Sequence, residues 1–382
     1  MIRNLIKNAG WPRIIIALFL LALFITAPFV GVNVFTSFNN TIVRFGMNGV
    51  MVLAMIPMVQ AGCGLNFGLP LGIIAGLLGA TLSIELNTEI LAKLAELGTQ
   101  YKISWLTQEF VTNYREPIGF ASALIIAIPV AAVLGWFYGK LLNRVKGDEM
   151  MIATYVGFSS VSFMCIAWLL LPYKHPTMVW GYAGRGLRTT ISVDGFWLHV
   201  LNDWLSLDFN KTLEISGKTI DVNLSIPTGM LIFFAIMALL VWIFMRTKTG
   251  TAMTAVGSNP EFARASGVNV DKMRTISVVM STILGAIGII VYEQSFGFIQ
   301  LYMGPFYMAL PAVASILLGG ASVNKATILN VVVGTFLFQG ILTMTPTVFN
   351  SMFQTDMSEV IRLIVSNGMI LYAFTRKFRS YG

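Results

Sequence analysis

The sequence has few charged residues: Asp, Glu, Lys and Arg make up 11% of its 382 residues, whereas hydrophobic residues make up 56%. Soluble domains of ordinary composition carry about 25% charged residues. A chain of this length with so few charges has too little polar surface to cover a water-soluble globule. Together with a mean hydropathy of +0.77, the composition excludes a soluble protein and predicts an all-α polytopic integral membrane protein.

The sequence also has little material for metal or covalent chemistry. The two cysteines, Cys63 and Cys165, lie far apart in apolar segments. The two histidines, His175 and His199, share one loop without the spacing of metal ligands. No nucleophile motif and no pair of catalytic carboxylates is present. We therefore expect no disulfide, no metal site, no bound cofactor and no enzymatic activity in this chain.

Two common energy sources for transport are disfavoured within the chain itself. The nearest match to an ATP-binding loop, residues 216–219, has Thr212 where the motif requires glycine. Ion-coupled transporters usually keep carboxylates or histidines inside the membrane, whereas the apolar segments here hold almost none. Glu293 and Glu359 lie at segment edges, and Glu359 is spaced to pair with Arg362 at i,i+3. We therefore expect neither ATP hydrolysis nor ion coupling by this chain alone.

What the sequence does contain is a series of long apolar runs within a single membrane domain, residues 1–382. A span needs about 20 mostly apolar residues, and reading for such runs predicts about ten transmembrane helices: 14–32, 42–61, 68–84, 118–139, 150–171, 227–245, 275–292, 306–320, 326–345 and 358–375. The third and eighth are short and flanked by Gly and Pro. Interruptions at 62–72 and 304–320 indicate broken helices of the kind that build substrate sites near the bilayer midplane.

The distribution of basic residues predicts the orientation. With the N-terminus inside, fifteen of the 25 Lys and Arg residues fall in inner segments, while eight fall in two long outer loops. Arg44 and Arg362 lie near span ends. Because positive charge accumulates in cytoplasmic loops, we expect both the N-terminus and the C-terminus to lie on the cytoplasmic side of the membrane. The expected location is the cytoplasmic (inner) membrane. The net charge of +8 is thus explained by topology in the lipid bilayer, and no nucleic-acid partner is expected.

The two long outer loops contain predicted structure. Residues 85–117 show a short helix with Asn87 as its cap and Gly98 as its stop. Residues 172–226 include an alternating pattern around Gly217 that predicts a small β-hairpin. These elements either form a platform for an external partner or simply cover the membrane face, and the sequence leaves both open.

The inner loop 246–274 contains a predicted short helix with capping residues at both ends. Asn259 is suited to accept an orphan backbone N–H as N-cap, and Pro260 follows at the first helical position. Gly267 supplies the left-handed residue that ends helices. So well defined a helix over 260–266 indicates a docking element, although an ordinary surface helix that closes a turn would show the same signals.

The predicted spans carry neutral polar residues: Asn48, Gln60, Asn66, Thr154, Gln294, Asn330 and Gln339. Such amides and hydroxyls can line a path for a neutral hydroxylated solute, but they also serve for hydrogen bonds between membrane helices. Aromatic residues near the outer face, Phe296, Phe298 and Tyr302, can stack on a ring or form an interfacial belt. We predict a substrate pathway that includes Asn48, Gln60, Asn66, Phe67, Thr154, Tyr155, Gln294 and Phe298.

Four blocks in this order resemble the membrane permease subunit of bacterial ABC importers of the ribose/branched-chain amino acid type. They are Gly64–Pro70, Met151–Tyr155, Thr249–Val268 and Ile316–Ser322. The third, similar to T-x-G-R…A-x-G-x-N…A-A-x-x-S-G-I, is the most specific. The sequence departs from the family pattern where Asn66 replaces Asp, Gly68 replaces Ser and Pro70 replaces Gly, and where Asn324–Thr327 replaces a second Gly pair. The outer loops are also longer than those of sugar members.

The resemblance implies a mechanism and partners. Two permease subunits, as a homodimer or a pair of paralogues, would form the pore, and two ATPase subunits carrying ATP and Mg would drive it. An extracytoplasmic binding protein would deliver the solute. The identity of the solute does not carry over with the resemblance, and a sugar and a nucleoside are the two candidates. The helix 260–266 would be the coupling helix in the ATPase groove, with Phe262 as anchor. The residues assigned to this contact are Asn259, Pro260, Glu261, Phe262, Ala263, Ala265, Ser266 and Gly267.

Two other classes of function stay open from the sequence. A stand-alone secondary transporter or facilitator would move solute without an ATPase. A receptor-like membrane protein would bind a ligand through its outer loops without moving it. Transport by the purified chain, or binding without flux, distinguishes these from an importer subunit.

Overall fold

The computed structural model describes residues 11–100, 108–179, 186–215, 218–354 and 357–378. Its helices are α2 (Trp11–Thr26), η1 (Ala27–Val30), α3 (Val34–Leu53), α4 (Met55–Gln60), α5 (Leu69–Gln100), α6 (Gln108–Asn113), α7 (Arg115–Arg144), α8 (Glu149–Leu170), α9 (Val200–Asp203), α10 (Thr228–Arg246), α11 (Lys248–Ser258), α12 (Pro260–Ala265), α13 (Val270–Phe296), α14 (Gly304–Leu318), α15 (Ile328–Phe353) and α16 (Ser358–Phe378). The strands are β1 (Thr190–Ser192), β2 (Leu207–Ile215), β3 (Lys218–Ile226) and β4 (Phe298–Gln300).

The fold class is confirmed: the chain is an all-α polytopic membrane protein. Each of the ten predicted spans falls on a helix. By length and composition, eight helices of the described residues can cross a membrane, and the predicted spans on α14 and α16 fall outside this set. With 15 residues, α14 is about 22 Å long, short of the roughly 30 Å hydrocarbon core. In α16, Glu359 and Arg362 interrupt the apolar run near its start.

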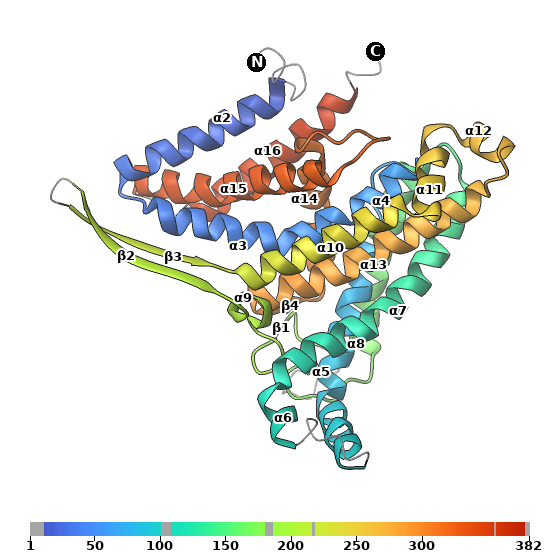
Figure 1. Cartoon of the computed structure of the whole chain (residues 1–382), viewed down its shortest axis with the longest axis horizontal. Coiled ribbons are helices and arrows are strands. Elements are labelled where there is room, and N and C mark those ends of the chain that lie inside the picture. Colours follow the sequence, from blue (N-terminus) through green and yellow to red (C-terminus); the bar gives the residue numbers. More distant parts are fainter. Residues whose placement is uncertain (1–10, 101–107, 180–185, 216–217, 355–356, 379–382) are drawn as a thin grey trace.

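The core is built around α13, which packs along α7, α5 and α3 (Figure 1). Small residues let these helices approach closely, as is usual where membrane helices pack. A Cβ added to Gly79 of α5 would lie 2.5 Å from the Cβ of Ala127 in α7. One added to Gly288 of α13 would lie 2.8 Å from the backbone nitrogen of Met51 in α3. A second layer, in which α15 packs on α3, α14 and α16, completes the bundle.

One predicted helix start in the outer loops is wrong. No helix begins at Asn87, because α5 runs unbroken from Leu69 to Gln100. The Asn87 side chain is buried within that helix. Its segment is also held from the side, since the Glu85 carboxylate accepts hydrogen bonds from the backbone nitrogens of Lys174 and His175. An Asn can cap a helix or lie inside one. Here the helix continues past Asn87, because apolar residues on both sides favour the helical conformation.

The segment 172–226 contains two pieces of β-structure. Strands β2 and β3 pair in antiparallel register from Leu207↔Ile226 to Ile215↔Lys218, a hairpin longer than the one the sequence indicated. It projects away from the bundle in Figure 1. Strand β1 pairs with β4, which follows α13, with Ile191 opposite Ile299. This second pairing fixes the outer loop to the end of the central helix.

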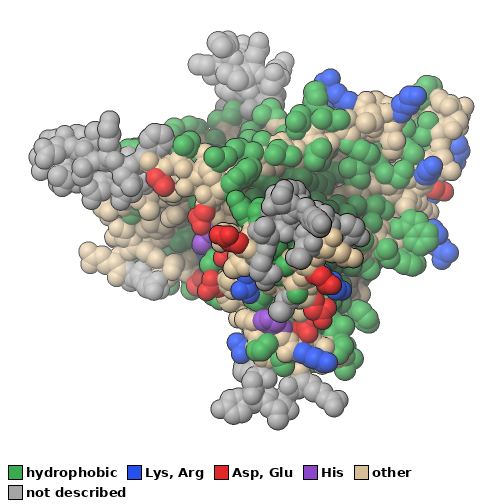
Figure 2. All heavy atoms as spheres, turned by 60° about the horizontal axis from the view of Figure 1, so that its bottom comes forward, with side chains coloured by type: hydrophobic (Ala, Val, Ile, Leu, Met, Phe, Trp, Pro, Cys, Tyr) green, Lys and Arg blue, Asp and Glu red, His purple; other side chains and the backbone are tan. Residues whose placement is uncertain are grey.

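The surface matches a protein surrounded by lipid. In Figure 2, hydrophobic side chains cover much of the helical body, and acidic side chains gather over the lower central part, near α5 and α6. Two basic side chains lie over aromatic rings: the Lys140 Nζ is 3.6 Å from the Trp136 ring centroid, and Arg246 is 4.0 Å from that of Trp242. Both pairs lie at the helix ends that the charge distribution assigns to the cytoplasm, where amphipathic side chains favour the interface.

Candidate functional site

The first candidate site is α12 and the turn that follows it. The Asn259 Oδ1 accepts a hydrogen bond from the backbone nitrogen of Phe262 at 3.0 Å, which caps the first turn. Gly267 has φ +82°, and its backbone nitrogen donates to the Arg264 carbonyl. The backbone nitrogen of Val268 donates to the Ala263 carbonyl at 3.0 Å. This pair of bonds is the Schellman closure of a helix C-terminus, so both ends of this six-residue helix are fixed locally.

The side chains of α12 divide into an outward and an inward set. Phe262 is 69% exposed, so α12 presents a large aromatic side chain on its outward side. The other outward residues assigned to the partner contact are Pro260, Glu261, Ala265 and Ser266. Ala263 points inward: it is 1% exposed and packs against Val256 and Val270. Its small side chain therefore serves the packing of α12 on α11 and α13, and a direct contact of Ala263 with a partner, as the sequence suggested, is not compatible with its burial.

A tight joint connects α11 and α12 to the interrupted helix α4–α5. A Cβ on Gly257, at the end of α11, would lie 2.1 Å from the Gln60 carbonyl oxygen. A Cβ on Gly62 would lie 2.9 Å from the Gly257 Cα. The Gln60 Nε2 in turn donates a hydrogen bond to the Ala326 carbonyl, just before α15. The end of α11 is thus packed directly on the backbone of the turn that begins at Gln60.

Beside this joint lies a cavity of about 350 Å³ lined by Glu149, Arg274 and residues of α12. The Arg274 Nη2 pairs with the Glu149 Oε1, and these side chains are 9% and 16% exposed. The Arg274 Nε also donates to the Cys63 Sγ at 3.4 Å. Burial raises the pKa of the Cys63 thiol. This network ties α8, α13 and the turn before α5 to one another.

The departures from the family pattern in the turn at residues 64–70 fit one another. The Asn66 Nδ2 donates to the Ser281 Oγ at 2.8 Å, and its Oδ1 accepts from the Tyr138 hydroxyl at 3.3 Å. A Cβ on Gly68 would lie 2.3 Å from the same Tyr138 oxygen, so any larger residue would displace it. The Asn at 66 and the Gly at 68 thus belong to one packing arrangement with Tyr138.

The replaced Gly pair at Asn324–Thr327 also has a structural reason. Thr327 caps α15: its Oγ1 accepts from the backbone nitrogen of Asn330, and the Asn330 Oδ1 accepts from the backbone nitrogen of Thr327. This reciprocal pair is a capping box. The Asn330 Nδ2 also donates to the Gly319 carbonyl at 2.7 Å, which connects the start of α15 to the end of α14.

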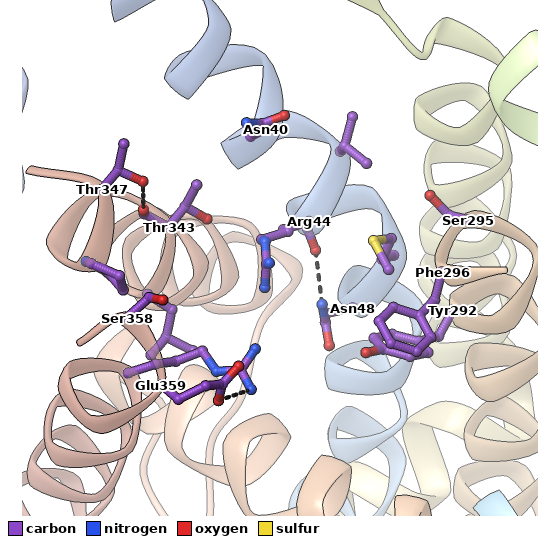
Figure 3. A pocket seen from close by; sticks show the side chains of 15 residues that line it. Asn40, Arg44, Asn48, Tyr292, Ser295, Phe296, Thr343, Thr347, Ser358 and Glu359 are labelled. Carbon is purple, nitrogen blue, oxygen red and sulfur yellow. Dashed lines mark hydrogen bonds and ion pairs between the residues drawn. The ribbon is translucent and has the colours of Figure 1, made fainter. Parts of the chain in front are cut away.

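The second candidate site is a cavity of about 470 Å³ between α3, α13, α15 and α16. Figure 3 shows Arg44 of α3 between Thr343 and Thr347 of α15 on one side and Asn48 on the other, with Glu359 at the start of α16. On the opposite side, the rings of Tyr292 and Phe296 stack with centroids 5.3 Å apart and an interplanar angle of 29°. The cavity therefore combines charged groups, amides and hydroxyls with one aromatic wall.

Of the predicted pathway residues, the structure brings Asn48 to this cavity. The side-chain amides of Gln60, Asn66 and Gln294 form hydrogen bonds within the fold. Gln294 accepts one from the backbone nitrogen of Leu201 and donates one to the Asn202 side chain. The Thr154 hydroxyl donates to the Met150 carbonyl one turn earlier. The sequence left two roles open for these four residues, lining a pathway or bonding within the fold. The structure shows the second.

The aromatic members of the predicted pathway lie apart from one another. Phe67 is partly buried in the core beside the interrupted helix. Tyr155 is 62% exposed on the outside of α8, and Phe298 is half-exposed in β4. Phe296 lines the cavity, whereas the Tyr302 hydroxyl donates to the Leu187 carbonyl in the outer loop. The predicted set does not form one continuous lining in this structure.

Sequence reasoning missed the charged residues of the cavity. Arg44, Glu359 and Arg362 were placed at span ends and assigned no function, yet all three line the same space. The signal in the sequence was Arg44 itself, one turn before Asn48, in a segment with no other charge. An ionisable residue within a membrane span is a functional candidate by default.

The chain matches the family described as "Branched-chain amino acid transport system / permease component" over residues 16–371. It is 23% identical over 265 residues, 66% of this chain and 77% of the relative, to the autoinducer 2 import system permease protein LsrC of Escherichia coli O157:H7. It is 34% identical over 110 residues, 28% of this chain and 32% of the relative, to the galactose/methyl galactoside import permease protein MglC of Haemophilus influenzae. It is 31% identical over 85 residues, 22% of this chain and 26% of the relative, to the nucleoside ABC transporter permease protein NupC of Lactococcus lactis subsp. cremoris. No solved structure matches the chain.

Proposed function

The chain belongs to the family of branched-chain amino acid transport system permease components, and from this membership we propose that it is the translocation-pathway subunit of an ATP-driven importer. It is a multi-pass membrane protein of a transport family. The proposal adds that it lies in the cytoplasmic membrane with both termini inside, that ATP and Mg are held by separate ATPase subunits, and that the chain itself binds no cofactor.

The proposal of coupling to an ATPase rests on the geometry of α12. A partner that pushes on a membrane protein needs a rigid exposed element joined to the spans. Phe262 supplies an exposed apolar anchor of the type that dominates interfaces. The caps at Asn259 and Gly267 keep the helix formed. The contact between Gly257 and Gly62 transfers its displacement to the interrupted helix.

In this mechanism α11, α12 and the turn at residues 60–68 move as one body. Closure of the ATPase subunits would displace α12, and the joint would carry that displacement to α5 and, through Asn66 and Ser281, to α13. Interfaces and packed cores switch between discrete arrangements and do not deform continuously, which turns a small shift into a change of access.

The remaining partners are a second permease subunit, a copy or a paralogue, and an extracytoplasmic solute-binding protein. The projecting hairpin β2–β3 and the loop held by β1–β4 lie on the face assigned to the outside. They are available there to contact the binding protein. The solute we propose is small, neutral and hydroxylated, a sugar or a nucleoside. The relatives named for galactose and nucleoside import support this class.

The test is Phe262→Asp in the intact importer. A carboxylate at the anchor position would have to be desolvated against the ATPase groove, so we expect ATP-driven uptake to fall to background and the ATPase to be lost on co-purification. The matched control is Phe262→Leu, which keeps an apolar anchor and should retain most of the uptake. Unchanged expression and thermal stability of Phe262→Asp would show that the loss is not a folding defect, since the side chain is exposed.

Uptake by Phe262→Asp at the level of the unmodified chain would contradict the coupling role of α12. Solute flux in liposomes that contain the purified chain without ATP would instead favour a stand-alone transporter or facilitator. The chain would then share the fold of its family but not an ATP-driven mechanism.

A further inference from the structure

The cavity between α3, α13, α15 and α16 has an unbalanced charge. Among the described residues, three charged side chains line it: Arg44 from α3, and Glu359 and Arg362 from α16. The Arg362 Nη2 donates to the Glu359 Oε2 at 2.6 Å, so those two charges compensate each other. The Arg44 guanidinium has no hydrogen bond or ion pair within the described part of the chain. Two guanidinium groups and one carboxylate give the described part of the lining one excess positive charge.

Among the described lining residues, those from α13 and α15 carry no negative charge that could pair with Arg44. From α13 come the aromatic rings of Tyr292 and Phe296, and from α15 the hydroxyls of Thr343 and Thr347. The Thr347 hydroxyl already donates to the Thr343 carbonyl. Arg44 sits within a predicted membrane span, Val34–Gln60, and is half-buried. A cation held there without a partner is costly, and such residues usually pair with another group.

From this arrangement we infer that the cavity binds one anionic group, a phosphate or a carboxylate, on the Arg44 guanidinium. The planar guanidinium presents two parallel N–H groups, which match the oxygens of such an anion. Arg362 uses one nitrogen on Glu359 and retains further N–H groups on the same cavity. An anion beside Arg44 brings the lining to neutrality.

The volume and the lining of the cavity indicate how large the ligand can be and what its uncharged part resembles. About 470 Å³ exceeds the volume of a phosphate or carboxylate alone, so the cavity has room for a larger molecule that carries the anionic group. The stacked rings of Tyr292 and Phe296 offer a flat apolar face to the remainder of that molecule. Two sources provide this chemistry: a soluble acidic solute, such as a sugar phosphate or sugar acid, and the headgroup of an acidic phospholipid.

The experiment measures ligand-dependent thermal stabilisation of the full chain in nanodiscs, since binding to the folded state raises its melting temperature by mass action. In one arm, ribose 5-phosphate, gluconate or neutral ribose is titrated into phosphatidylcholine nanodiscs. In the other arm, phosphatidylglycerol replaces an increasing fraction of the phosphatidylcholine. We expect stabilisation by the anionic ligand in one of the two arms, and a larger effect of that ligand than of its neutral counterpart.

Three variants test the role of Arg44. Arg44→Gln should weaken the apparent affinity at least about tenfold, because charge-assisted bonds are lost, and its stability without ligand should not fall. Glu359→Gln should tighten binding a few-fold, because it removes a negative charge from the lining. Lys93→Gln, which removes an exposed cation on α5 outside this cavity, should bind like the unmodified chain. A general loss of folding cannot produce opposite effects in Arg44→Gln and Glu359→Gln.

Stabilisation by soluble anions that Arg44→Gln abolishes would identify an acidic solute, and would replace the neutral solute proposed above. Stabilisation by phosphatidylglycerol alone, abolished by the same variant, would identify a lipid headgroup and leave the neutral solute standing. The inference is overturned if neither anion stabilises the unmodified chain, or if Arg44→Gln responds as the unmodified chain does. No ATPase takes part, so these results stand apart from the test of ATP coupling.

Discussion

The two ends of this molecule differ in the contact between their backbones and in the burial of their ion pairs. At the end assigned to the cytoplasm, the Gly62 and Gly257 backbones touch and the Arg274–Glu149 pair is buried beside them. In the outer half, a cavity of about 470 Å³ separates the helices, and its ion pair, Arg362–Glu359, is 46% and 71% exposed. The comparison suggests two roles. The end with the Gly62–Gly257 backbone contact, called the filled end although a cavity of about 350 Å³ lies beside that contact, transmits displacement. The open end, around the cavity of about 470 Å³, receives a ligand.

The contrast has a physical basis. A close-packed interior has few voids and passes strain from one element to the next. Backbone contact at two glycines leaves no side chain whose rotamer can absorb a displacement. A cavity lined by partly exposed charges and hydroxyls has no such constraint, because its groups can rearrange around whatever occupies it.

The largest expected effect on stability comes from Glu149→Ala at the filled end. It leaves the buried Arg274 guanidinium without its carboxylate. Loss of one partner of a buried pair typically costs about 3–5 kcal/mol, so we expect a marked fall in the free energy of unfolding, measured by thermal or denaturant unfolding in detergent. The double variant Glu149→Leu with Arg274→Met, which removes both charges, should recover much of that loss. A Glu149→Ala protein as stable as the unmodified chain would mean that the pair contributes little to the joint.

A smaller effect is expected from Gly257→Ala, which tests the backbone contact. The added Cβ would lie 2.1 Å from the Gln60 carbonyl oxygen, so the chain must shift. Overpacking of this kind usually costs about 1–3 kcal/mol. The matched control is Gly368→Ala in α16, where no atom lies within 4 Å of the added Cβ. That variant should be neutral or slightly more stable, because alanine favours helix. Equal stabilities of the two variants would argue against a rigid joint.

The features of the filled end that the sequence predicted are those set by local chemistry. Asn259, Pro260 and Gly267 act on backbone groups within one turn, so the predicted helix 260–266 differs from α12 by a single residue. The same local reasoning was wrong at Asn87, where a capping residue lies inside a continuous helix. Capping types indicate where a helix can begin, but the residues on both sides decide whether it does.

The open end was harder to predict because it depends on which helices become neighbours. Arg44 and Arg362 lie on α3 and α16, at opposite ends of the sequence, and no spacing rule connects them. Conversely, Gln294 and Asn66 looked like pathway residues, but their amides bond to Asn202 and Ser281. A neutral polar residue in a span has the same sequence signature whether it faces a cavity or a neighbouring helix.

The smallest effect on stability is expected from Glu359→Gln, the counterpart of Glu149→Ala at the open end. An exposed pair three residues apart on a helix contributes about 0–1 kcal/mol, because water and salt screen it and both side chains lose rotamer freedom. We therefore expect the unfolding free energy to change by less than about 1 kcal/mol, and the difference to shrink further at high salt. A loss as large as that of Glu149→Ala would mean that Arg362 is effectively buried when its partner is absent. The open end would then be a second rigid element, and the division between a transmitting end and a receiving end would fail.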